Sequence, residues 1–135
     1  MRTCALDIRV YYEDTDAGGI VFYANYLKFA ERGRTEYLRE CGFENKSLMD
    51  MQGVIFVVRR VEADYLTPTY LDDMLRLETV VTEIKNASFT MKQSLFRHNE
   101  LVFCANVILV CVDRSGKPVR LPDELRSVMM ESQEK

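Results

Sequence analysis

The chain has 135 residues, of which 47% are hydrophobic, and a formal net charge of −3 at pH 7. This length suits one globular domain with its own core, and the absence of any run of more than two Lys or Arg residues argues against a nucleic-acid partner. No apolar stretch reaches the length of a membrane span, and the N-terminus lacks the apolar core of a signal peptide. We therefore expect a single domain over residues 1–135 with no integral membrane segment.

The four cysteines and the single histidine, His98, argue against a metal site. No two cysteines form a C-x-x-C pair, and one histidine does not complete a zinc cluster. Cys41, Cys104 and Cys111 have apolar neighbours and are expected to be small core residues, whereas Cys4 is expected to be exposed. Free cysteines are typical of a reducing compartment, so we expect a cytoplasmic protein that holds neither a metal nor another cofactor.

The first predicted element is a strand over residues 6–12, where apolar and polar side chains alternate. An acidic turn follows, with three carboxylates within four residues at Glu13, Asp14 and Asp16, and then a Gly-Gly pair. The glycines permit positive φ and let a ligand approach the backbone closely. We expect Asp14 to have a structural role, bonded to the backbone of the turn.

A strongly amphipathic helix is predicted after this turn. Apolar residues recur at helical spacing on one stripe, at Tyr26, Leu27, Phe29, Ala30, Gly33, Tyr37, Leu38 and Cys41, and the opposite stripe is polar. A glycine inside a helix costs roughly 0.5–1 kcal/mol relative to alanine, so Gly33 is expected to admit the close approach of another element. Arg34 lies at the edge of the apolar stripe and is expected to find a hydrogen-bond acceptor.

The turn and the helix together suggest a chemistry. The start of a helix presents unpaired N–H groups and the positive end of the helix dipole. A carboxylate beside such donors supplies the two things that ester or thioester hydrolysis requires, a nucleophile or base and a group that stabilises the oxyanion. The structural alternative is a solvated helix cap, since acidic turns before helices commonly serve that purpose.

The second half of the chain reads mainly as strands. A short helix capped by Ser47 is predicted over residues 47–52, and alternating or apolar runs then predict strands over 54–66, 75–84, 88–97 and 101–113. The last of these is nearly all apolar, as expected of a strand covered on both faces. A final short helix is predicted from Pro122 to about Met130. One early helix followed by long antiparallel strands predicts an α+β fold in which a curved sheet wraps around one long central helix.

Several catalytic arrangements are missing from the sequence. There is no G-x-S-x-G elbow, and the single His98 does not serve a Ser-His-Asp triad. There is also no P-loop and no G-x-G-x-x-G run. A hydrolase with this sequence would therefore have to use a carboxylate.

The stretch DTDAGGIVFYANYLKFAERGRTEYL resembles the signature of the 4-hydroxybenzoyl-CoA thioesterase family of hot-dog proteins. The runs YYEDTDAGG, FVVRRVEADYLTPTYLDD and LVCVD are similar to its Tol-Pal-associated acyl-CoA thioesterase branch. The resemblance extends from about Arg9 to Leu121. It implies the hot-dog fold, hydrolysis of an acyl thioester to the free acid and CoA, and a homodimer or dimer of dimers whose subunits form a continuous sheet with active sites at the dimer interface.

The same resemblance assigns roles to individual residues. It places the catalytic carboxylate, as nucleophile or general base, at Asp16, and the backbone N–H that polarises the thioester carbonyl at Tyr23, where the Tol-Pal branch usually carries histidine. Gly19 would admit the thioester, and Lys85 is the position in the turn between the third and fourth strands that matches the basic residues of the CoA clamp. Arg59, Arg60, Lys92 and Arg97 are further cations that could meet CoA phosphates.

Asn25 and Tyr26 are also candidate substrate contacts at the start of the helix, with packing and capping as the structural alternative. Three other functions stay open beside acyl-CoA hydrolysis. The substrate could be an acyl group carried by an acyl carrier protein, or the domain could bind an acyl thioester without hydrolysing it. A dehydratase or isomerase is disfavoured, because such enzymes normally place a histidine near a carboxylate and His98 lies outside the motif.

Overall fold

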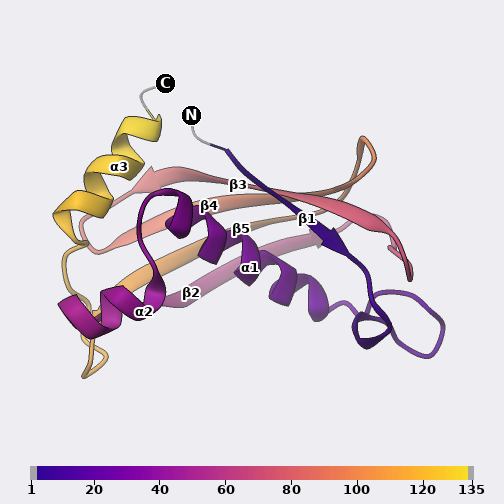
Figure 1. The fold of residues 1–135 in the computed structure, drawn as a ribbon, viewed down its shortest axis with the longest axis horizontal. Coiled ribbons are helices and arrows are strands. Elements are labelled where there is room, and N and C mark those ends of the chain that lie inside the picture. Colours follow the sequence, from indigo (N-terminus) through magenta and orange to yellow (C-terminus); the bar gives the residue numbers. More distant parts are fainter. Residues whose placement is uncertain (1–2, 134–135) are drawn as a thin grey trace.

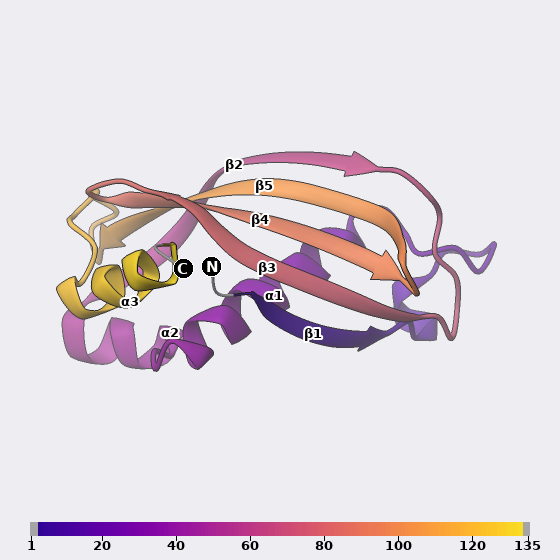
Figure 2. The same cartoon turned by 90° about the horizontal axis from the view of Figure 1, so that it is seen from above.

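The computed structural model describes residues 3–133 (Figure 1). Five antiparallel strands form one sheet in the order β1-β3-β4-β5-β2. The strands are β1 (Cys4–Arg9), β2 (Val54–Tyr65), β3 (Met74–Ile84), β4 (Ser88–Arg97) and β5 (Glu100–Asp113). The helices are α1 (Asn25–Glu40), α2 (Asn45–Ser47) and α3 (Asp123–Gln133). Figure 2 shows all three helices on the same side of the curved sheet, which confirms the predicted wrapping of a sheet around one long helix.

Helix α1 packs against the sheet with the stripe that its periodicity predicts. Seven of the eight predicted apolar positions are buried, and the exception is Leu27, which is exposed although its neighbour Tyr26 in the same turn is buried. Gly33 is the point of closest approach, since a Cβ atom built there would lie 2.5 Å from Leu77 Cδ2 and 2.8 Å from Thr79 Oγ1 on β3. Any larger side chain would therefore push the helix away from the sheet.

The strands alternate as expected on the helix side of the sheet. On β3 and β4 every second side chain is buried, and buried residues of β5 include Phe103, Ala105 and Val107. The prediction that β5 is covered on both faces is wrong for the single chain, because Ile108 and Val110 on the other face are only half-buried and the helices cover one side. Strand β2 is an edge strand and exposes several valines.

Several element boundaries differ from the predicted ones. Strand β1 stops at Arg9 instead of residue 12, because the backbone N–H of Tyr11 bonds to the Asp14 carboxylate (2.8 Å) and the chain turns into the short 3₁₀ segment η1 (Tyr12–Asp14). Strand β2 ends one residue early, at Tyr65. The final helix starts after Pro122, whose carbonyl accepts the first helical bond from Arg126.

The predicted cap at Ser47 is wrong. The helical segment begins at Asn45, so Ser47 already has helical dihedral angles and caps nothing, and α2 continues into the π-helical turn η2 (Leu48–Gln52). Cys4 is also not exposed as predicted, since it starts β1 opposite Thr79 and is buried. Cys104 lies half-buried on the outer face of β5, with its sulfur 3.9 Å from an Asp64 carboxylate oxygen.

Within residues 3–133, none of the helices is sufficiently long and apolar to cross a membrane.

Candidate active site

Asp16 lies in a small hairpin between β1 and α1. Its backbone N–H bonds to the carbonyl of Ile20 (2.8 Å), Thr15 pairs with Val21, and the N–H of Phe22 bonds to the carbonyl of Asp14 (3.0 Å). The residues at the tip, from Asp16 to Gly18, are exposed. We call residues 14–22 the Asp16 hairpin. Its geometry presents the carboxylate to solvent at one end of the sheet.

The two carboxylate oxygens of Asp16 have different surroundings. Oδ1 accepts hydrogen bonds from the backbone N–H groups of Gly18 (2.8 Å) and Ile20 (3.4 Å). Oδ2 accepts no hydrogen bond from residues 3–133. One oxygen thus fixes the orientation of the carboxylate, and the other is free to meet a ligand. Gly19 has φ +79°, a conformation that side chains disfavour, and no atom lies within 4 Å of the position of a Cβ there.

Asp14 and Asn25 connect the hairpin to the start of α1. Asp14 is buried, its carboxylate accepts the N–H of Tyr11 (2.8 Å), and its carbonyl accepts the Asn25 side-chain amide (2.7 Å). The structural role predicted for Asp14 is confirmed. Asn25 is buried too, so this contact gives it a structural role, and contact with a substrate stays a prediction.

The start of α1 leaves two backbone donors free. The N–H groups of Tyr23 and Ala24 bond to no acceptor within residues 3–133, whereas the N–H groups of Phe22 and Asn25 on either side are paired. These free groups carry the positive end of the dipole of a 16-residue helix. The arrangement can stabilise a negative oxygen placed beside them.

An aromatic cluster surrounds these donors. The Tyr23 ring is exposed, lies 4.9 Å from the ring of Phe22 and packs edge-on against Tyr65 at 6.0 Å. Tyr26 is buried, stacks on Phe103 at 5.1 Å between ring centres and shares a hydrogen bond with another side chain, so packing explains its position. Burial and the neighbouring phenols of Tyr23 and Tyr26 raise the pKa of Tyr65 above its ordinary value.

Lys85 is not near Asp16 in the same chain. Strand β3 starts at Met74, beside the end of β1 that leads into the hairpin, and runs away from it to Ile84. Ten residue steps at ~3.3 Å each span about 33 Å. Lys85 lies instead beside Arg59 and Arg60, and the three cations line a cleft of about 330 Å³ at the opposite end of the sheet.

A second cavity, of about 480 Å³, runs along the later turns of α1. Its lining is largely apolar and includes Leu38, Met49, Phe56 and Phe89. Arg34 borders this cavity and donates to the side-chain oxygen of Gln93 (3.1 Å). Arg34 was expected to find a hydrogen-bond acceptor, and Gln93 supplies it. Burial lowers the pKa of the Arg34 guanidinium from its ordinary value.

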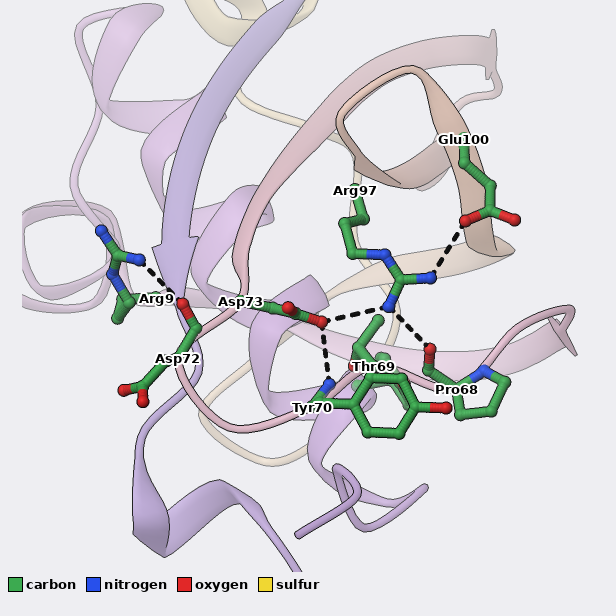
Figure 3. Close-up of polar contacts among 9 residues, drawn as sticks. Arg9, Pro68, Thr69, Tyr70, Asp72, Asp73, Arg97 and Glu100 are labelled. Carbon is green, nitrogen blue, oxygen red and sulfur yellow. Dashed lines mark hydrogen bonds and ion pairs between the residues drawn. The ribbon is translucent and has the colours of Figure 1, made fainter.

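Sequence analysis missed the segment that supports the hairpin. Residues 69–71 pair with residues 19–21, through bonds from Val21 N–H to the Thr69 carbonyl (2.9 Å) and from Leu71 N–H to the Gly19 carbonyl (3.1 Å). Figure 3 shows that Arg97, at the end of β4, contacts Tyr70 in this segment and the flanking residues Pro68 and Asp73. The only signal in the sequence was the acidic pair Asp72-Asp73, and the sequence does not show that Asp73 pairs with Arg97.

Comparisons with known proteins place the chain in one family. Residues 10–129 match the thioesterase-like superfamily. The chain is 46% identical over 121 residues to the acyl-CoA thioesterase YbgC of Haemophilus influenzae, covering 89% of each sequence. Among solved structures, a probable thioesterase from Bartonella henselae is 36% identical with a TM-score of 0.87, over 90% of this chain and 100% of the other.

Proteins of lower sequence identity have the same fold. The 4-hydroxybenzoyl-CoA thioesterase of Pseudomonas sp. strain CBS-3 has a TM-score of 0.88 over 95% of this chain and 99% of its own, at 23% identity. Identity this low shows the fold alone. The predicted hot-dog fold and the predicted family are both confirmed, whereas the Tol-Pal association stays a prediction.

Proposed function

Because the chain belongs to the thioesterase-like superfamily, we propose that it hydrolyses acyl-CoA thioesters with the Asp16 carboxylate as nucleophile or general base. The backbone N–H of Tyr23, at the start of α1, polarises the thioester carbonyl. The observation that carries the proposal is the free oxygen of an oriented carboxylate in the same hairpin–helix unit as two unpaired N–H donors.

The reaction can follow either of two routes. In the first, a carboxylate oxygen of Asp16 adds to the thioester carbon, the C–S bond breaks, and the mixed anhydride is hydrolysed by water. In the second, Asp16 takes a proton from water as the oxygen of that water adds to the carbonyl carbon, and the departing CoA thiolate receives the proton. In both routes the negative charge develops on the carbonyl oxygen, where the N–H groups of Tyr23 and Ala24 stabilise it.

The apolar cavity beside α1 is our candidate for the acyl pocket. Its volume of about 480 Å³ lies within the range common for small-molecule sites, and Leu38 and Phe89 are among the side chains that would contact a hydrocarbon or an aromatic ring. The first residue of the lining, Glu31, is six residues beyond the start of α1 at Asn25. At ~1.5 Å per residue, an acyl group held at the helix start would need to extend about 9 Å to reach it.

We also propose that the active enzyme contains at least two copies of the chain. The two edge strands of the sheet are β1 and β2, and β2 is the longer, with twelve residues and with Val57, Val58 and Val61 exposed. Such an edge is normally paired or covered. If β2 pairs antiparallel with β2 of a second copy, the Tyr65 end of one strand lies beside the Val54 end of the other.

This pairing would unite the predicted residues that one chain separates. The Tyr65 end of β2 contacts Tyr23 near the Asp16 hairpin, whereas the cleft with Lys85 opens beside Arg59 and Arg60 in the middle of β2. One copy would then supply the reacting groups and the other the cations for CoA phosphates. Guanidinium and ammonium groups are well suited to bind phosphate.

The test is release of free thiol from acyl-CoAs of increasing chain length and from an aromatic acyl-CoA, with acyl carrier protein thioesters assayed in parallel. The proposal predicts turnover of acyl-CoA. Turnover of acyl carrier protein thioesters alone would give the carrier-protein alternative, and tight binding of acyl-CoA without thiol release would make the domain a binding module. Either result would overturn the proposal.

Subunit sharing has its own test. Asp16→Asn and Lys85→Glu damage different sites of a shared active centre, so mixing the two variants under conditions of subunit exchange is predicted to restore turnover at low acyl-CoA concentration. Light scattering that shows an active monomer near 15.7 kDa would contradict the dimer.

A further inference from the structure

Arg97, the last residue of β4, binds the segment that precedes β3 through several groups at once. One guanidinium nitrogen donates to the Pro68 carbonyl (3.1 Å) and to the Asp73 carboxylate (3.1 Å), and the other donates to Glu100 (3.0 Å). The guanidinium also lies 5.7 Å from the centre of the Tyr70 ring. Figure 3 shows these contacts converging on one side chain.

Asp73 links the Arg97 side chain to the backbone of the segment that precedes β3. The carboxylate oxygen that binds Arg97 also accepts the N–H of Tyr70 (2.9 Å). Exposed ion pairs contribute little to structure, but the Arg97 and Asp73 side chains are only 19% and 23% exposed and share hydrogen bonds with the backbone. The pair therefore holds residues 68–73 in one conformation more firmly than a solvent-exposed pair would.

Residues 69–71 are in turn the main support of the Asp16 hairpin. They form backbone bonds to Gly19 and Val21 (3.1 and 2.9 Å), and Ile20 pairs with Tyr70. The tip itself has no comparable packing, since Asp16 is exposed and the space beside Gly19 is empty. The order of the tip thus depends on the backbone pairing below it.

We propose that Arg97 is a positioning residue for the reaction, acting through Asp73 and residues 69–71 to fix the orientation of the Asp16 carboxylate. The proposal rests on the catalytic role proposed for Asp16. Arg97 contacts residues 68–73 and not the hairpin itself, so this role needs no contact with the substrate. A displacement of about 1 Å at a reacting group can cost on the order of 10² in rate, so a support of this kind is sufficient to matter.

The test compares Arg97→Met with Arg76→Met. Arg76 is a matched control, because it also forms an ion pair (with Glu78, 2.8 Å) and also lies over an aromatic ring (Phe96, 4.9 Å), but it does not contact residues 68–73. We expect Arg97→Met to lower kcat roughly 10- to 100-fold with little change in KM, Arg97→Lys to recover part of the loss, and Arg76→Met to resemble the wild type. Equal kcat values for Arg97→Met and Arg76→Met would overturn the proposal.

A structural measurement follows the hairpin directly. The N–H groups of Gly18 and Ile20 bond to Asp16 Oδ1, so their hydrogen exchange reports the order of the tip. Exchange is expected to accelerate in Arg97→Met and to stay unchanged in Arg76→Met. If Arg97→Met does not fold, Arg97→Lys serves in its place, with a smaller effect of the same sign, and unchanged exchange and kcat in that variant would overturn the proposal.

A double variant separates positioning from general damage. In an Asp16→Asn background, Arg97→Met is expected to lower the residual rate no further, since the group that it positions is already disabled. A further loss as large as in the wild type would contradict the proposal. If Asp16→Asn itself turned over normally, the proposed function would fail; if only Arg97→Met did, the positioning role alone would fail.

Discussion

The middle of α1 and its N-terminal end belong to one helix but have opposite surroundings. Around Gly33 the helix touches β3 so closely that no side chain fits, and the buried Gln93 amide donates to the helix carbonyl of Ala30 (2.7 Å). At the N-terminal end, Tyr23 and Phe22, just before the helix, are 63% and 47% exposed, and two backbone N–H groups have no partner among the described residues. The packed middle stabilises the fold, and the open N-terminal end is available for chemistry and for a second copy.

The largest effect on folding is expected from a change in the packed middle of α1. Gly33→Leu would place side-chain atoms where Leu77 Cδ2 already lies within 2.5 Å of a Cβ position, and overpacking of this kind typically costs about 1–3 kcal/mol or more. Glu36→Ala is the control, because it removes only a surface ion pair with Arg39 and should change stability by less than about 0.5 kcal/mol. Equal melting temperatures for the two variants would contradict the packing.

The reactivity of the cysteine thiols also distinguishes packed from open parts of the molecule. Burial, reinforced by the neighbouring Glu40 at the end of α1, raises the pKa of the Cys4 thiol to about 11, and burial does the same for Cys111. Both thiols are therefore protonated at pH 8 and should react slowly with iodoacetamide in the native protein, whereas the half-buried Cys104 should react first. Mass spectrometry of the labelled protein identifies the site, and rapid labelling of Cys4 would contradict its burial.

The same raised pKa values predict how stability depends on pH. A folded-state pKa above the ordinary value of 9.0 means that the protonated thiol is favoured in the native protein. This contribution is fully present below pH 9 and is lost as the pH rises toward 11. Denaturant unfolding of Cys111→Ala should therefore show a smaller decline over that interval than unfolding of the wild type. An identical decline would contradict the assignment.

The smallest effect is expected at the open end. Tyr23→Phe keeps the backbone N–H and removes only an exposed hydroxyl, so it should retain most activity. Loss of a donor from an oxyanion hole typically costs about 10²–10³ in rate. A loss of that size in Tyr23→Phe, measured as kcat for an acyl-CoA, would show that the phenol itself takes part.

The contrast also explains what the sequence predicts well. The helical period identified the buried stripe of α1, including Gly33, because burial against a sheet leaves a regular pattern in the sequence. It misassigned Leu27, since periodicity records polarity and not whether another element covers that position. The alternation of apolar and polar residues predicted β3 and β4 equally well, and the observed bounds of both strands agree with the predicted ones to within one residue.

The support of the candidate site left no comparable pattern. The pairing of Gly19 with Leu71 and of Arg97 with Asp73 joins segments far apart in the chain by a few contacts without a regular period. Lys85 was predicted from a resemblance that concerns an assembly, and one chain places it at the end opposite Asp16. Local patterns predict elements, whereas the site depends on how distant loops meet.

The most direct test of the account is Asp16→Asn, which keeps the size and much of the hydrogen-bonding shape of the side chain. If the carboxylate is nucleophile or general base, turnover of acyl-CoA should fall by at least roughly the 10²–10⁴ that a positioned acid–base group contributes. Binding of a non-hydrolysable acyl-CoA analogue, measured by calorimetry on the same folded variant, should change little, because the N–H groups of α1 and the cavity are unaltered. Hydrolysis by Asp16→Asn at the wild-type rate would contradict the account and place the chemistry elsewhere.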